Sequence, residues 1–169
     1  MSRLKDRVAV VSGAAAGLGR AAAIRLAAEG AKIEILDIKN ASEVCDEIRA
    51  AGGEAYSSIC DVTNEAQISE AVKGVEQRHG RVDILVNNAG ILSGRTPWHQ
   101  LTYDEINRFV QINYIGYFLV SKAVYPLLKK SQCGRVINVA SRTYFLANPG
   151  QMAYVAAKGA VMGFTRVLA

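Results

Sequence analysis

The sequence predicts an α/β fold, in which a doubly wound parallel sheet carries helices on both of its faces. Two observations predict it. Short apolar runs alternate with longer helical segments along all 169 residues, which is the pattern of repeated strand–helix–strand units. The first unit, from Arg7 to Asp37, also has a glycine-rich turn between its strand and its helix. The length suits a single domain, residues 1–169, with a sizeable buried core.

The glycine-rich turn is the most informative stretch of the chain. The strand from Val8 to Val11 ends in SGAAAGLG, residues 12–19; an alanine-rich helix then stops at Gly30, and a second strand ends in Asp37. Small residues let the backbone approach a ligand, and the helix N-terminus offers N–H groups to an anion. A dinucleotide pyrophosphate fits this arrangement, with Asp37 on the ribose hydroxyls. The alternatives are glycines that only allow helix–sheet packing and an acid that is merely solvated or caps a helix.

The remaining elements follow in order. Asn64 and Thr102 begin their helices with predicted capping boxes, in which Gln67 and Glu105 reach back. Pro126 is expected to bend the long fourth helix. The expected helices span residues 41–51, 64–79, 102–130 and 151–169, the expected strands span 54–60, 82–86 and 135–140, and loops cover 91–101 and the polar stretch after Ser141.

Composition excludes several classes of protein. The net charge of +5 comes from scattered residues, with no clustered basic face for a nucleic acid. No apolar run approaches the length of a membrane span, and the N-terminus lacks a signal-peptide core. The three cysteines form no CxxC pair, which favours free thiols in a reducing cytoplasm over a metal site or disulfides. We therefore expect a cytoplasmic protein without a metal, a nucleic-acid partner or a membrane partner.

Polar or small residues follow the apolar strands at the edge where ligands of open α/β sheets bind. The helix near residue 151 adds Tyr154 and Lys158, whose four-residue spacing places them on one face. A cation beside a phenol favours the phenolate, so this pair can exchange a proton near neutral pH. The hydroxyl of Ser141 can bind the same substrate oxygen. Taken alone, the pair also suits an ordinary amphipathic helix, and Ser141 an ordinary strand end.

Six motifs that occur in a fixed order characterise the chain more specifically than the Tyr154–Lys158 pair or Ser141 alone. They are SGAAAGLG, the pair Asp61-Val62, NNAG at 87–90, Asn113 within QINYIGYF, Ser141 within INVAS, and YVAAK at 154–158. In this combination the chain resembles the classical short-chain dehydrogenase/reductase family, whose fold is Rossmann-type. The resemblance covers the whole chain. It differs from the family pattern at Ser12, where threonine is common, and at its end, because the family's domain continues through two more strands.

The resemblance implies a role for each matching residue. Tyr154 would be the catalytic acid/base, Lys158 would lower its pKa and hold the nicotinamide ribose, and Ser141 would polarise the substrate carbonyl. Asn113 would anchor a water in the proton path, the alternative being an asparagine bonded to nearby backbone. The implied cofactor-binding set is Ser12, Gly13, Gly17, Leu18, Gly19, Asp37, Asp61, Val62, Asn88, Ala89, Gly90, Tyr154 and Lys158.

These roles predict an NAD-dependent oxidoreductase that interconverts a secondary alcohol and a ketone. NAD is favoured over NADP because the Asp37 carboxylate would repel a 2′-phosphate, although Lys39 and Arg20 lie close in sequence. The aromatic residues Trp98, Tyr114 and Tyr117 suit either an apolar substrate or the core and subunit interface. Two alternatives remain: a 3-oxoacyl-thioester reductase using NADPH, and a truncated nucleotide-binding module without turnover.

Two further expectations concern the whole protein. The last helix has no stop signal before Ala169, so we expect that the C-terminal strands are missing from this chain and that the native protein continues. The resemblance also implies a homodimer or homotetramer, with subunit contacts along the helices at 102–130 and around Tyr154.

Overall fold

A computed structural model of the chain describes residues 2–92, 94–146 and 148–169. One position in the loop expected after Gly90 and one in the loop expected after Ser141 therefore lie outside the described residues. Five strands form one sheet in the order β3-β2-β1-β4-β5, and every neighbouring pair is parallel. The strands are β1 (Val8–Ser12), β2 (Lys32–Asp37), β3 (Ala55–Ile59), β4 (Ile84–Asn87) and β5 (Arg135–Asn138). The predicted doubly wound parallel sheet is confirmed.

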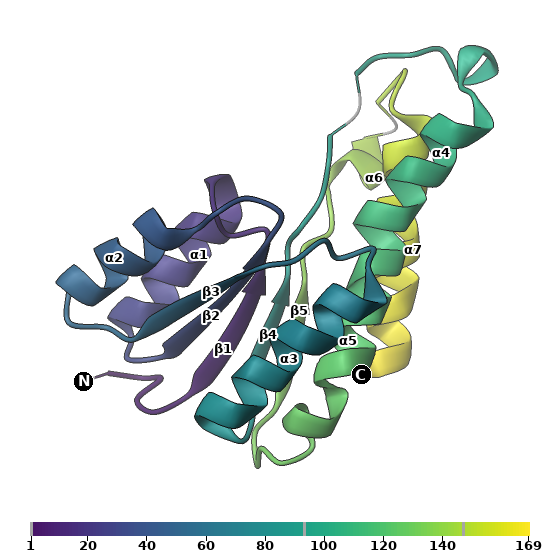
Figure 1. The fold of residues 1–169 in the computed structure, drawn as a ribbon. Coiled ribbons are helices and arrows are strands. Elements are labelled where there is room, and N and C mark those ends of the chain that lie inside the picture. The colour runs from purple at the N-terminus through teal and green to yellow at the C-terminus, as the bar shows by residue number, and fades with distance from the viewer. Residues whose placement is uncertain (1, 93, 147) are drawn as a thin grey trace.

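Helices cover both faces of this sheet (Figure 1). One face carries α1 (Gly17–Ala28) and α2 (Ser42–Ala50); the other carries α3 (Glu65–His79) and α5 (Gly116–Leu128), with α7 (Met152–Leu168) beside α5. Beyond the carboxyl ends of the strands lie η1 (Trp98–Gln100), α4 (Tyr103–Val110) and α6 (Thr143–Leu146). The carboxyl edge of the sheet is thus flanked by loops and short helices, which is where such folds bind ligands.

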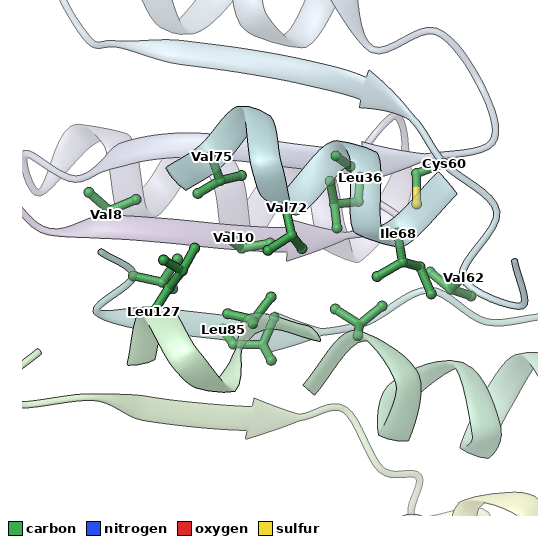
Figure 2. Packing of buried hydrophobic residues seen from close by; sticks show 14 residues of the cluster. Val8, Val10, Leu36, Cys60, Val62, Ile68, Val72, Val75, Leu85 and Leu127 are labelled. Atoms are coloured by element: carbon green, nitrogen blue, oxygen red, sulfur yellow. The ribbon is translucent and has the colours of Figure 1, made fainter. Parts of the chain in front are cut away.

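Alternation along each buried strand builds two apolar cores. Val8 and Val10 belong to the cluster under α3 and α5, whereas Ala9 and Val11 belong to the cluster under α1 and α2. Figure 2 shows the first cluster: valines of α3 pack against the sheet, and Leu127 of α5 lies at one end of the cluster. Apolar burial on both faces makes β1 and β4 nearly inaccessible to water and fixes their register.

The helix starts agree only in part with the capping expectations. The Thr102–Glu105 capping box is confirmed in both halves. Asn64 does cap α3, because its Oδ1 accepts from the backbone N–H groups of Ala66 and Gln67. The predicted reciprocal half is wrong, however, since the Gln67 side chain accepts from the N–H of Asp61, 2.8 Å away, and not from Asn64.

The structure also corrects two longer expectations. The helix expected over 102–130 consists of α4, a π-helical turn η2 (Gln111–Ile115) and α5, which ends at Leu128. The loop expected after Ser141 contains the short helix α6. Hydrophobic spacing did not indicate either feature. Pro126 does lie inside α5, while the expected bend there remains a prediction.

A buried acid ties β2 to α3. Glu34 is 0% exposed, and its carboxylate accepts from Arg78 through Nε at 2.7 Å and Nη2 at 2.8 Å, and contacts His79 Nε2 at 2.8 Å. The guanidinium of Arg78 also lies over the ring of Tyr56 from β3, 4.9 Å from its centre. A buried carboxylate needs such partners because burial of an unpaired charge is costly.

Loss of this pairing should destabilise the protein far more than loss of a surface ion pair. Arg78→Met leaves Glu34 buried with its main cationic partner removed, so we expect a loss of about 3–5 kcal/mol in the free energy of unfolding. Arg25→Met, which breaks an exposed pair with Glu29, should cost at most about 1 kcal/mol. Urea unfolding of the intact protein measures both, and equal losses would contradict the role given to Glu34.

Candidate active site

The turn between β1 and α1 provides an open anion-binding position. Gly13 and Gly17 have left-handed backbones, with φ of 67° and 59°. A Cβ on Gly13 would lie 2.6 Å from the Cα of Ala89, whereas one on Gly17 would meet nothing within 4 Å. Among the described residues no side chain caps α1, and its first turn holds no acid. The N–H groups at the start of α1 therefore face open space, which suits a phosphate.

A second turn, which follows β4, is joined to the first turn by hydrogen bonds. Asn88 donates from Nδ2 to the carbonyl oxygens of Ser12 (3.1 Å) and Gly13 (2.9 Å). The Ser12 hydroxyl in turn accepts from the N–H groups of Asn88 (3.0 Å) and Ala89 (3.1 Å). Ser12 is therefore buried behind the turn, and Gly19 is packed against Gly13 and Asn88. Neither lines the cavity described next, so the structure does not place these two predicted cofactor-binding residues in direct contact with it.

A cavity of about 810 Å³ runs along the carboxyl ends of β1, β2, β3, β4 and β5. Its volume lies within the range of roughly 300–1,000 Å³ that is typical of ligand pockets. Every other predicted site residue lines it, namely Gly13, Gly17, Leu18, Asp37, Asp61, Val62, Asn88, Ala89, Gly90, Asn113, Ser141, Tyr154 and Lys158. Four further residues that sequence reasoning did not single out for the site line it as well: Ile38, Cys60, Ile91 and Ile112.

The acids at one end of the cavity are held by backbone groups. Asp37 accepts from the N–H of Ala15 (2.8 Å) and of Lys39 (2.9 Å), one on each carboxylate oxygen. A carboxylate oxygen has two lone pairs, so both oxygens keep capacity for a ligand hydroxyl. Asp61 accepts from the N–H and the hydroxyl of Thr63 on a single oxygen, Oδ1. Both acids are thus fixed in orientation and remain able to accept from a ligand.

The three residues expected to carry chemistry converge at the other end. Tyr154 and Lys158 lie one turn apart on α7, and Ser141, three residues after the end of β5, lines the same cavity. The Ser141 Oγ lies 2.8 Å from the Oγ1 of Thr143 and accepts from the N–H of Thr143 at 3.3 Å. Thr143 therefore orients the serine hydroxyl, a role that sequence reasoning did not give it.

Lys158 is the most unusual member of this group. It is only 3% exposed, and its Nζ donates to the hydroxyl of Tyr117 (2.9 Å) and to the carbonyl oxygen of Val139 (2.7 Å). Burial lowers the pKa of Lys158 to about 8. Within the described part of the chain it makes no ion pair. A buried cation with neutral partners only, in a cavity wall, indicates a functional site.

Asn113 lies in the π-helical turn η2, at the centre of the cavity wall. It is fully buried, accepts from the N–H of Ile91 at 3.1 Å, and donates to the carbonyl oxygen of Phe109 at 3.1 Å. A Cβ on Gly90 would lie 2.6 Å from its Oδ1, so this close contact requires a glycine. The side chain of Asn113 therefore bonds to backbone, as in the alternative weighed for it, and joins the turn after β4 to η2.

Two further observations concern metal binding and membrane spans. Among the described residues no three His, Cys, Asp or Glu side chains are grouped so that they could hold a metal ion. None of the helices in the described part has the length and apolar character needed to cross a membrane.

The fold and the cavity define a class of protein: a Rossmann-type α/β domain with a ligand cleft at the point where the strand order reverses. Comparison with known proteins specifies the family. The family model for short chain dehydrogenases matches residues 7–169, so the chain belongs to that family.

Relatives and solved structures agree with this assignment. The chain is 38% identical to a 3-oxoacyl-[acyl-carrier-protein] reductase of Synechocystis, over 100% of this chain and 69% of the relative. It is 37% identical to levodione reductase of Leifsonia aquatica, over 98% and 63%. The crystal structure of carveol dehydrogenase from Mycobacterium avium in complex with NAD superposes with a TM-score of 0.95 at 29% identity, over 100% and 66%. The chain spans about two thirds of the length of these proteins.

The buried lysine should make stability depend on pH. Because the folded-state pKa of about 8 lies below the ordinary value of 10.5, the cation disfavours folding below pH 8, and this cost is relieved as the pH rises from 8 to 10.5. The free energy of unfolding should therefore rise by about 3 kcal/mol across that window relative to Lys158→Met, which lacks the titrating group. Urea unfolding of both proteins at several pH values measures the difference. If the free energies of unfolding of the two proteins changed with pH in the same way, Lys158 would have its ordinary pKa.

Proposed function

We propose that the protein catalyses NAD(H)-dependent interconversion of a secondary alcohol and a ketone. The observation that carries this proposal is that Ser141, Tyr154 and Lys158 line the same cavity as the glycine turn and Asp37. A hydroxyl, a phenol and an ammonium group at the end of a dinucleotide-sized cleft suit proton exchange with a substrate oxygen.

The residues present fit a nicotinamide dinucleotide. The uncapped start of α1 and the open space at Gly17 suit its pyrophosphate, Asp37 suits the adenosine ribose, and Asp61 and Val62 suit the adenine. Asn88, Ala89 and Gly90 form the wall between the two ends. When bound, this cofactor supplies or accepts the hydride, and the protein has to position the substrate and move a proton.

The chain's own residues divide these tasks. Ser141, oriented by Thr143, donates a hydrogen bond to the substrate oxygen, and Tyr154 gives or takes the proton at that oxygen. Lys158 places its positive charge in the same wall, where it stabilises negative charge that develops on the tyrosine and the substrate. We keep Asn113 as the proposed anchor of a water in the proton path; its side chain also joins the N–H of Ile91 to the carbonyl oxygen of Phe109 and keeps one acceptor and one donor position.

Asp37 supports NAD as the preferred cofactor. Its carboxylate is fixed by two N–H groups and keeps acceptor capacity for two hydroxyls, while a 2′-phosphate would meet a like charge. The NAD bound to the related carveol dehydrogenase adds support. A reductase of 3-oxoacyl thioesters that uses NADPH is the second candidate, favoured by the Synechocystis relative and by Lys39 beside Asp37 in the cavity.

We further propose that the protein assembles into a homodimer or homotetramer. Phe118 and Tyr125 on α5 are exposed large apolar side chains, as are Met152 and Val167 on α7. Apolar residues gathered on adjacent helices are typical of surfaces that bind another chain.

Loss of the Tyr154 hydroxyl should abolish turnover without abolishing cofactor binding. For Tyr154→Phe we expect kcat to fall by about 10²–10⁴, the usual contribution of a positioned acid/base, with the Kd for NAD(H) changed only a few-fold. Tyr103→Phe, at an exposed position at the start of α4, is the matched control and should keep full activity. Steady-state assays of the intact protein with secondary alcohols, ketones and 3-oxoacyl thioesters measure turnover. Undiminished kcat in Tyr154→Phe would remove the assignment.

Neutralising Asp37 should change the cofactor preference. In Asp37→Asn the repulsion of a 2′-phosphate is lost while the side chain keeps its shape, so the ratio of kcat/KM for NAD to that for NADP should fall at least about tenfold. The ratio is the informative quantity, because any loosening of the turn at Ala15 affects both cofactors. Asp46→Asn, on the exposed side of α2, should leave it unchanged. An NADP preference in the unmodified protein would favour the second candidate.

A further inference from the structure

A second tyrosine lies against the ammonium group of Lys158. Tyr117 belongs to α5, is 1% exposed, and receives a hydrogen bond of 2.9 Å from Lys158 Nζ. The same ammonium lies over the Tyr117 ring, 4.7 Å from its centre. Tyr117 does not line the cavity, so it contacts the lysine from the protein interior, on the side away from the ligand.

The hydrogen bonds around this tyrosine have a defined direction. The Tyr117 hydroxyl donates to the carbonyl oxygen of Val139 at 3.3 Å, and the same carbonyl accepts from Lys158 at 2.7 Å. With its proton directed to Val139, the phenol oxygen presents lone pairs to the ammonium. The three groups form a closed triangle in which Lys158 donates twice and Tyr117 is both donor and acceptor.

We propose that Tyr117 is a positioning residue, whose neutral hydroxyl and ring hold Lys158 charged and aimed at the active site. This inference rests on the proposed function, because it assigns Lys158 a catalytic task. An ammonium group buried without an acid is stabilised only by neutral acceptors and by the face of an aromatic ring. Tyr117 supplies both of these, and Val139 supplies the remaining acceptor.

The environment also separates the roles of two nearby tyrosines. Burial raises the pKa of Tyr117, and the nearby Tyr154 raises it further, so Tyr117 stays a neutral phenol over the working pH range. Tyr154 instead lines the cavity, where it can reach a substrate. The other titratable side chains of the cavity wall are Asp37, Lys39, Cys60, Asp61 and Arg142, and within the described residues none of them pairs with Lys158.

The test is the titration of Lys158 with and without the Tyr117 hydroxyl. In Tyr117→Phe the ring remains while one acceptor is lost, and a hydrogen bond to a charged group shifts its protonation equilibrium by about tenfold. We expect the Lys158 resonance of ¹³C-lysine-labelled intact protein, identified by its absence in Lys158→Met, to titrate about one pH unit lower. The corresponding limb of the kcat/KM profile should move by the same amount in the same direction.

The control is Tyr56→Phe, the same change at a tyrosine on β3 that does not line the cavity and lies outside the proposed subunit contacts. It should leave the lysine titration and the pH profile unchanged. Tyr117→Leu, which lacks both the hydroxyl acceptor and the ring, provides a second variant, and thermal unfolding confirms that each variant is folded. Unchanged titration in folded Tyr117→Phe, or an equal change in Tyr56→Phe, would overturn the proposal. Absence of NAD(H)-dependent turnover in the unmodified protein would instead refute the proposed function, since the titration needs no substrate.

Discussion

The contact between the two turns that follow β1 and β4 is the constraint on which the cavity depends. Strand order reverses at this point, so the chain leaves β1 toward one face of the sheet and β4 toward the other. The side chain of Asn88 and the hydroxyl of Ser12 then join the two turns with hydrogen bonds from both sides. Because Gly13 has no Cβ, the turns can approach closely, and the glycine turn and the NNAG turn share one cleft wall.

At the β5 end of the cavity, the candidate site contains a charged side chain whose burial is unfavourable. Lys158 sits in the interior with neutral partners only within the described chain, an arrangement that a structure built only for stability would not favour. Under the proposed function, catalysis and stability therefore oppose each other at this residue. Glu34 shows the contrast: it is equally buried but paired with Arg78, and it does not line this cavity.

Local patterns predicted most of the fold and most of the site. The strand–turn–helix at residues 7–37 and the spacing of Tyr154 and Lys158 could be read directly, because each depends on neighbours in sequence. The roles of Gly19 and Tyr117 could not, since each is decided by a contact with a distant element. Tyr117 did carry one signal: a tyrosine in an apolar helix needs a partner for its hydroxyl if it is buried. The sequence did not indicate that the partner would be Lys158.

The π-helical turn at Gln111–Ile115 has a consequence for how this region tolerates change in chain length. An α-helix advances about 100° per residue, so one residue held in a wider turn rotates everything after it by that amount relative to a regular helix. The phase of α5 is therefore set by η2: it directs Val120 and Val124 into the core and Tyr117 toward Lys158. Deleting a single residue from this turn would produce a more regular helix whose apolar stripe no longer faces the sheet. Substitutions can accumulate here more readily than insertions or deletions.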